Sequence, residues 1–173
     1  MWVSGVIYKR VVLKAEAVQT VRREMRKAKV TETGGALVGY IEDEKLVVTA
    51  ASGPGPRARL SLREVWIDGE YAGKFCDRAY SQTGGKWDYV GDWHCHLGCS
   101  LKPSSTDRYA MKKMAGFEYC PTRNPLSLIF CKWSHRIKAY RFDGGLVLVP
   151  HVSETPRRRS KDNQAVKRVR FGM

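Results

Sequence analysis

Three residues with metal-ligating side chains lie close together in the middle of the chain. His94 and His96 are one residue apart, and Asp107 follows eleven residues after His96. On a strand, side chains two positions apart project from the same face, so both imidazoles can bind one ion. We expect Asp107 in the first turn of a helix, with residues 97–103 folded back to bring its carboxylate in. Two imidazoles and one carboxylate predict a catalytic Zn²⁺ site, with one ion per chain and an open position for water.

Metal-assisted hydrolysis also needs a general base beside the water and a donor for the oxyanion. Ser104 is the candidate donor because Asp107 follows it by three residues. Glu32 is the candidate base, since Gly34 and Gly35 allow backbones to approach closely where a strand is expected to start. Two simpler interpretations stay open. The histidines also fit ordinary surface positions, and Ser104 and Asp107 also fit a plain helix N-terminus.

The same residues resemble a known motif. His94-x-His96-x₇-Ser104-x₂-Asp107, with Glu32 upstream, is similar to the JAMM motif of the JAB/MPN metallopeptidases. The similarity continues in three neighbouring segments, Thr33–Gly39, Gly91–His94 and Pro103–Asp107. It extends from about residue 3 to about residue 152. The short form of the chain looks most like the JAB proteins of integrative elements and of CD-NTase antiphage operons.

The resemblance implies a fold, an activity and a set of roles. The fold would be a single JAB/MPN-type domain of cytidine-deaminase-like architecture, with helices flanking a mixed sheet. The activity would be a zinc-dependent peptidase or isopeptidase that cuts after the C-terminal glycine of a ubiquitin-like protein or its conjugate. His94, His96 and Asp107 would bind the Zn²⁺, Glu32 would be the base and Ser104 the oxyanion donor. E1-like and E2-like proteins of the same operon would be further partners.

Two positions depart from the family pattern. Cys95 stands between the histidines where members usually have Ser or Thr, and Leu97 follows His96 where members usually have Pro. Neither change removes a ligand. Cys95 is expected to point away from both imidazoles and to pack in the core. Leu97 is expected to leave the loop after His96 less constrained than Pro would.

Around these residues, the hydrophobic patterns predict one mixed α and β domain. Helices are expected at residues 14–29, 70–82 and 105–115. Strands are expected at residues 3–12, 36–41, 46–51, 60–67, 88–94, 126–133, 137–142 and 146–152. The Gly-Pro-Gly-Pro run at residues 53–56 predicts a loop. The domain is predicted to cover residues 1–155, followed by a basic, flexible tail at residues 156–173.

The bulk composition narrows the class of protein. A length of 173 residues and an apolar content of 43% fit one globular domain. No apolar run approaches the roughly 20 residues that cross a bilayer, so no membrane partner is expected. The first residues carry no signal-peptide pattern. Five irregularly spaced cysteines favour a reducing compartment, and hence the cytoplasm.

The charge of the chain leaves rival functions open. There are 31 Lys and Arg against 17 Asp and Glu, a net charge of +14. An excess spread along the whole chain fits a solvated surface, and it also suits an acidic partner such as nucleic acid. One rival is therefore a nucleic-acid-binding protein without catalysis. The other is a mononuclear iron oxygenase, which also uses two histidines and one carboxylate but has no role for Glu32.

Overall fold

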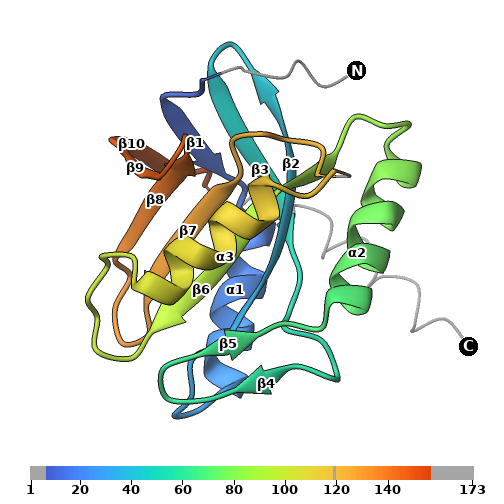
Figure 1. Cartoon of the computed structure of the whole chain (residues 1–173). Helices are drawn as coiled ribbons and strands as arrows, with labels where there is room; N and C mark the ends of the chain where they lie inside the picture. The colour runs from blue at the N-terminus through green and yellow to red at the C-terminus, as the bar shows by residue number, and fades with distance from the viewer. Residues whose placement is uncertain (1–6, 119, 157–173) are drawn as a thin grey trace, which may run out of the picture.

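Ten strands and three helices make up the described part of this computed structural model, residues 7–118 and 120–156 (Figure 1). The helices are α1 (Ala15–Lys27), α2 (Gly69–Gln82) and α3 (Ser105–Ala115). The strands are β1 (Arg10–Leu13), β2 (Gly34–Glu42), β3 (Lys45–Ala51), β4 (Arg59–Leu60), β5 (Val65–Trp66), β6 (Asp88–His96), β7 (Leu126–Cys131), β8 (Ile137–Phe142), β9 (Leu146–Val149) and β10 (His151–Glu154). Within these residues, no helix is long and apolar enough to cross a membrane.

Eight of the strands form one mixed sheet in the order β10-β1-β3-β2-β6-β7-β8-β9. β1 runs parallel to β10 and β3, and β6 runs parallel to β7, whereas the other neighbours are antiparallel. Only Pro150 separates β9 from β10, although these strands lie at opposite ends of the order. The sheet therefore curls until its two edges approach each other. Arg141 of β8 donates from Nη1 to the carbonyl of Tyr8, just before β1, at 2.7 Å.

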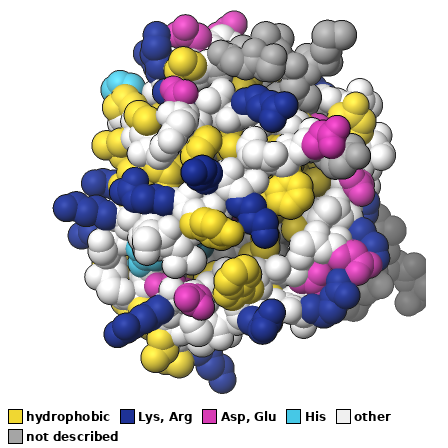
Figure 2. Space-filling model, viewed as in Figure 1, with side chains coloured by type: hydrophobic (Ala, Val, Ile, Leu, Met, Phe, Trp, Pro, Cys, Tyr) yellow, Lys and Arg dark blue, Asp and Glu magenta, His cyan; other side chains and the backbone are white. Residues whose placement is uncertain are grey.

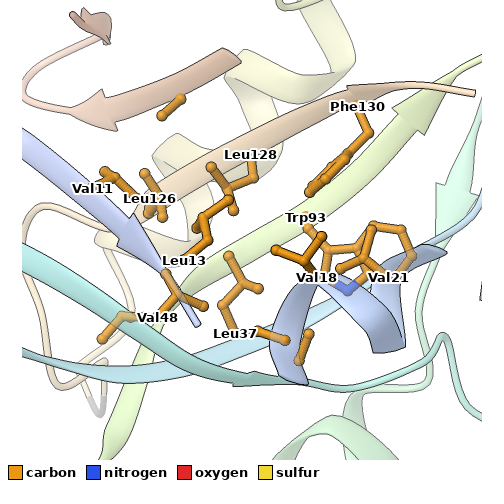
Figure 3. Packing of buried hydrophobic residues seen from close by; sticks show 14 of the residues in the cluster. Val11, Leu13, Val18, Val21, Leu37, Val48, Trp93, Leu126, Leu128 and Phe130 are labelled. Atoms are coloured by element: carbon orange, nitrogen blue, oxygen red, sulfur yellow. The ribbon is translucent and has the colours of Figure 1, made fainter. Parts of the chain in front are cut away.

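The largest hydrophobic cluster lies between α1 and the sheet (Figure 3). The apolar face of α1 is buried there because its small and branched residues recur every three or four positions. Trp93 and Cys95 of β6 belong to the same cluster and are almost wholly buried. Since side chains alternate along a strand, His94 and His96 point to the opposite face of β6. That side carries a second cluster, which includes Ala72 of α2.

The predicted mixed α and β class is confirmed, and the three helices lie where their patterns place them. Two strand predictions were wrong in the same way, because each covered two short strands. Residues 60–67 form the β4–β5 hairpin, since Ser61 Oγ accepts the Arg63 and Glu64 N–H groups and closes a turn. Residues 146–152 are split at Pro150, which lacks an N–H for the ladder, and β10 then pairs with β1.

Two other predicted strands are shorter in the structure. β1 begins only at Arg10, and residues 3–6 of the predicted strand 3–12 lie outside the described residues. β7 ends at Cys131 rather than at residue 133, because a turn follows in which Ser134 Oγ accepts the Arg136 N–H at 3.2 Å. The predicted tail lies outside the described residues except for Pro156.

Candidate metal centre

Three side chains converge at the end of β6 and the start of α3. The Nε2 atoms of His94 and His96 are 3.0 Å apart. Asp107 Oδ1 lies 3.2 Å from His94 Nε2, and Asp107 Oδ2 lies 3.4 Å from His96 Nε2. One ligand atom from each residue lies within 4.8 Å of the other two. These three side chains are mostly buried, so the arrangement fits a partly enclosed metal site with two nitrogen ligands and one oxygen ligand.

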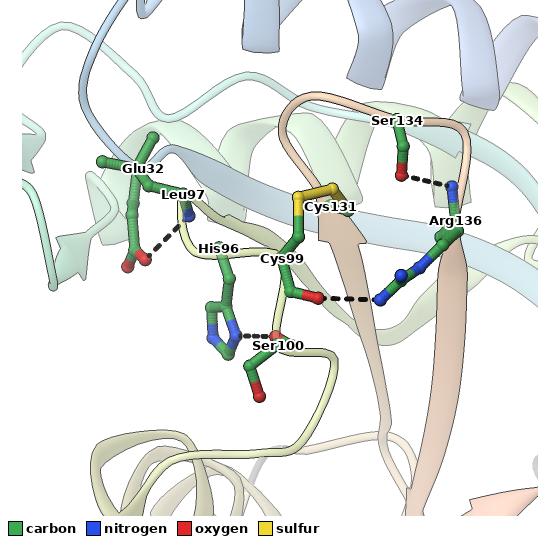
Figure 4. Close-up of a disulfide and its surroundings, with 8 residues drawn as sticks. All are labelled: Glu32, His96, Leu97, Cys99, Ser100, Cys131, Ser134 and Arg136. Carbon is green, nitrogen blue, oxygen red and sulfur yellow. Dashed lines mark hydrogen bonds between the residues drawn. A yellow bond between two sulfur atoms is a disulfide. The ribbon is translucent and has the colours of Figure 1, made fainter.

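The hydrogen bond at the far side of His96 orients its imidazole. His96 Nδ1 lies 2.6 Å from the carbonyl oxygen of Ser100 (Figure 4). A carbonyl only accepts, so Nδ1 carries a proton, and Nε2 is the ring nitrogen that faces the cluster. Outer contacts of this kind are common for histidines that bind metals, because they fix both the tautomer and the ring orientation.

The Asp107 carboxylate is kept in its charged form. Burial alone would raise its pKa, but hydrogen bonds from His94 and His96 outweigh burial and hold the pKa far below the ordinary value. The same carboxylate raises the pKa of His96 by accepting its hydrogen bond. The contacts with both histidines therefore favour the anionic form of Asp107, which is the form that binds a metal ion.

Ser104 and Asp107 form a reciprocal cap at the start of α3. The Asp107 N–H donates to Ser104 Oγ at 3.1 Å, and the Ser104 N–H donates to Asp107 Oδ2 at 2.6 Å. The structure thus confirms that Ser104 and Asp107 cap the N-terminus of α3. It does not exclude the oxyanion role, because capping uses an oxygen lone pair and leaves the hydroxyl proton of Ser104 free to donate. Ser104 is exposed, so a substrate can reach this proton.

Glu32 reaches the cluster from the segment between α1 and β2. Glu32 is only 9% exposed. Its Oε1 accepts a hydrogen bond at 3.4 Å from the backbone N–H of Leu97, the residue that follows His96 (Figure 4). Burial raises the pKa of Glu32, while His96 and the Leu97 N–H pull it down, and burial prevails. A carboxyl with a raised pKa is a better base near neutral pH than an ordinary glutamate.

Close backbone packing between β2 and β6 brings Glu32 into range. Gly34 pairs with His94 in the ladder, and a Cβ at Gly34 would lie 2.5 Å from the Trp93 carbonyl. No ordinary side chain fits at that distance without a backbone shift. Gly34, two residues after Glu32, therefore lets β2 begin directly against the histidine-bearing end of β6.

The two departures from the family pattern have different outcomes. Cys95 is fully buried in the cluster beneath α1, as predicted. Leu97 was expected only to leave the loop less constrained than proline would. That expectation missed the hydrogen bond from the Leu97 backbone N–H to Glu32, which proline could not make because it has no N–H. The loop after His96 is also held elsewhere. Arg136 Nη2 donates to the Cys99 carbonyl at 2.9 Å, and the Tyr140 hydroxyl donates to the Leu101 carbonyl at 2.7 Å.

A disulfide joins this loop to the end of β7. Cys99 is bonded to Cys131, which lies beside His96 in the ladder (Figure 4). The irregular cysteine spacing favoured reduced thiols, so the bond corrects that expectation. The two cysteines are 32 residues apart, and only the pairing of β6 with β7 brings them together. Cys76, Cys95 and Cys120 are free.

Breaking this bond is expected to cost stability rather than to change the ligand set. In the chain-entropy account, a loop closed over 32 residues contributes about 3–4 kcal/mol to the free energy of unfolding. Cys99→Ser should lower that free energy by this amount in urea titrations without reductant. Wild-type protein kept in dithiothreitol should show the same loss, and the variant should be indifferent to dithiothreitol. Five titratable thiols in denatured, unreduced wild type would contradict the pairing.

The family assignment follows from comparison with known proteins. Residues 14–142 match a family described as prokaryotic homologs of the JAB domain. The chain belongs to this prokaryotic JAB family. The match covers most of the chain and includes Glu32, both histidines, Ser104 and Asp107.

Two relatives of this JAB domain are each 30% identical to it. A probable metalloprotease, y4qB of Sinorhizobium fredii, aligns over 102 residues, which is 58% of this chain and 62% of the relative. A CD-NTase/cGAS isopeptidase of Enterobacter hormaechei aligns over 127 residues, which is 73% of this chain and 69% of the relative. The chain thus spans less than two thirds of the metalloprotease.

A solved structure has the same fold as this JAB domain. Protein DSY2949 of Desulfitobacterium hafniense, determined in solution, superposes with a TM-score of 0.64 at 16% identity. The similarity covers 85% of this chain and 94% of that protein. At this identity the similarity shows the fold alone, and the shared fold extends over most of both chains.

Proposed function

We propose that this JAB domain is a zinc-dependent peptidase or isopeptidase that hydrolyses the bond after the C-terminal glycine of a ubiquitin-like protein. The observation that carries the proposal is the convergence of His94, His96 and Asp107, with the Glu32 carboxylate held by the residue that follows His96. This set offers three ligands, and Glu32 lies outside it as a base. The names of the two relatives, a metalloprotease and an isopeptidase, agree with this reaction class.

The donor chemistry of the site fits zinc. Two imidazole nitrogens and one carboxylate oxygen are typical of catalytic zinc sites, and a zinc ion held there would supply a Lewis acid that polarises water and the scissile carbonyl. Glu32 would accept the proton of the attacking water and pass it to the leaving amine. The Ser104 hydroxyl would donate a hydrogen bond to the oxygen that becomes negatively charged. The capping bond to Asp107 N holds that hydroxyl at the edge of the site.

The position of the β4–β5 hairpin favours a substrate tail that binds in an extended conformation beside the site. The Glu32 N–H donates to the carbonyl of Ser61 in the hairpin at 2.8 Å, so the hairpin lies next to the base. Leu62 and Trp66 of the hairpin are more than half exposed and offer apolar contacts to a passing chain. Glycine suits the cleaved position because it brings no Cβ between its carbonyl and the site.

The test is cleavage of fusions of a ubiquitin-like protein to a reporter, joined through Gly, Ala or Leu. We expect the Gly-linked fusion to be cut, the Leu-linked fusion to resist, and a chelator to abolish cleavage until Zn²⁺ is restored. Elemental analysis should find about one zinc per wild-type chain, because the site offers one set of ligands. The His94→Ala, His96→Ala double variant should contain none.

Controls separate this activity from the rival functions. His135→Ala, at an exposed histidine in the turn after β7, should keep full zinc and full activity. Iron in place of zinc, or equal cleavage of the Gly and Leu fusions, would contradict the proposal. Salt-sensitive binding of nucleic acid that survives loss of both histidines would favour the nucleic-acid function. On the face in Figure 2, the Lys and Arg side chains are scattered among other residues, a distribution that supports solvation more than one continuous binding stripe.

The partners and the compartment belong to the same proposal. A ubiquitin-like conjugate would be made by E1-like and E2-like enzymes, so we expect genes for them beside the gene for this chain. We place the protein in the cytoplasm with its substrate, where the disulfide between Cys99 and Cys131 would encounter reductant. The antiphage setting rests on the resemblance to the JAB proteins of CD-NTase operons, and the Enterobacter relative is named a CD-NTase/cGAS isopeptidase.

A further inference from the structure

Lys132, the residue after β7, makes contacts with three separate segments. Its ammonium Nζ donates to the carbonyl of Met25 at 2.6 Å and to the carbonyl of Thr31 at 3.0 Å. Its backbone N–H donates to the carbonyl of His96 at 3.1 Å. One residue therefore connects the end of α1, the segment that carries Glu32, and the histidine-bearing end of β6.

The end of α1 needs a donor at this point. The N–H of Lys29 turns aside to the carbonyl of Arg26 at 3.3 Å, so the Met25 carbonyl takes its hydrogen bond from Lys132 instead. A cation at a helix C-terminus also interacts favourably with the helix dipole. The side chain is partly buried, and its two carbonyl partners are more than one hundred residues away in sequence. This is a specific long-range contact rather than a solvated surface lysine.

The contact acts on the backbone of Glu32 itself. The carbonyl before Glu32 belongs to Thr31 and is held by Lys132 Nζ. The carbonyl of Thr33, the residue after Glu32, accepts the Cys95 N–H at 3.0 Å. The residues on both sides of Glu32 are thus anchored through their carbonyls to the β6–β7 part of the sheet, where His96 lies. The Lys132 anchor is made by a side chain, so a substitution can remove it.

We propose that Lys132 is a positioning residue that sets the placement of Glu32 relative to His96. It binds the segment of Glu32 through Nζ and the strand of His96 through its backbone N–H. The inference rests on the proposed role of Glu32 as the base. Geometry of this kind matters in catalysis, because a misplacement of about 1 Å can cost about 10²-fold in rate.

Lys132→Met tests the proposal, because methionine keeps most of the length of the side chain and removes the Nζ donor, while the backbone N–H to the His96 carbonyl remains. We expect kcat to fall by about 10- to 100-fold, with KM and zinc content unchanged. Lys132→Arg should recover much of the loss, since its guanidinium also donates to carbonyls. Lys27→Met is the matched control. It removes the same charge from the same end of α1 but only an exposed contact with Glu24, and should leave kcat unchanged.

A double-mutant cycle with Glu32→Gln distinguishes positioning from general weakening. If Lys132 acts through Glu32, Lys132→Met should have little further effect on the residual rate of the Glu32→Gln protein. Equal fractional losses in both backgrounds would overturn the proposal. If Lys132→Met does not fold, as judged by its thermal transition, Lys132→Gln keeps an amide donor on a shorter side chain and is put through the same cycle.

Hydrogen exchange gives a readout that needs no substrate. Lys132→Met should speed exchange in a peptide covering residues 28–34, while a peptide covering β3 stays as in wild type. Unchanged exchange at residues 28–34 would overturn the proposal even if activity fell. If exchange rises there but wild-type protein cleaves none of the fusions, the anchor stands and the proposed peptidase function fails.

Discussion

Glu32→Gln is expected to bind zinc as wild type does and to lose about 10² to 10⁴ in kcat, the usual contribution of a general base. Glutamine has the shape of glutamate, and its Oε1 can still accept the Leu97 N–H that Glu32 accepts in the structure. What it lacks is a basic oxygen for the proton of the attacking water. Because Glu32 is outside the set of His94, His96 and Asp107, its loss should leave zinc content unchanged.

The role of Glu32 as a base also predicts the direction in which kcat changes with pH. Burial raises the pKa of Glu32 above its ordinary value of 4.5, and only the deprotonated carboxylate is a base. Wild-type kcat should therefore fall as the pH drops through a pKa that is higher than that of an exposed glutamate. Glu64→Gln, at an exposed carboxylate of the β4–β5 hairpin, should keep the full rate and the full profile. Normal turnover by Glu32→Gln would mean that another group activates the water.

The convergence of the histidines with Asp107 was predictable because it depends on local rules. Alternation along a strand puts His94 and His96 on one face, and the structure has Cys95 on the other. A serine three residues before an aspartate predicts a helix start, and α3 begins there with a reciprocal cap. The loop between these elements is long enough to fold back, so it allows the Asp107 carboxylate to reach the imidazoles.

The contacts that hold Glu32 and the loop after His96 were not predictable, because they depend on which strands become neighbours. Cys99 meets Cys131 only through the parallel pairing of β6 with β7. Lys132 reaches the end of α1 only because β7 ends beneath it. No periodicity in a single sequence encodes such a register. The Leu97 N–H is a backbone donor, and a search for chemically active side chains overlooks it.

The curl of the sheet was missed for a related reason. The local sequence of residues 146–152 predicts one apolar strand. Strand propensity depends on local sequence alone, so it cannot predict pairing with a strand at the other end of the sheet. In the structure, Pro150 divides the segment, and β10 pairs with β1 more than one hundred residues earlier in the chain. A proline inside a predicted strand was the available signal, since it cannot donate to a ladder.

Ser104→Ala is expected to lower kcat by about 10² to 10³ while zinc content stays near one per chain, if the hydroxyl stabilises the oxyanion. The complication is that Ser104 also caps α3, so alanine removes a helix cap worth about 1 kcal/mol as well as the donor. Glycine separates the two effects. At an N-cap it costs only a few tenths of a kcal/mol relative to serine, but it has no hydroxyl.

Ser104→Gly should therefore be as inactive as Ser104→Ala and clearly more stable. Ser104→Thr, which keeps both the cap and a hydroxyl, should retain most of the rate. Ser105→Ala is the control at the neighbouring position and should keep the wild-type rate. Ser105 is exposed at the first position of α3 and does not belong to the reciprocal cap. Rates measured on folded protein, with the free energy of unfolding determined for each variant, decide between the roles. If activity follows stability, so that glycine recovers what alanine loses, Ser104 serves Asp107 as a cap and the oxyanion is stabilised by other groups.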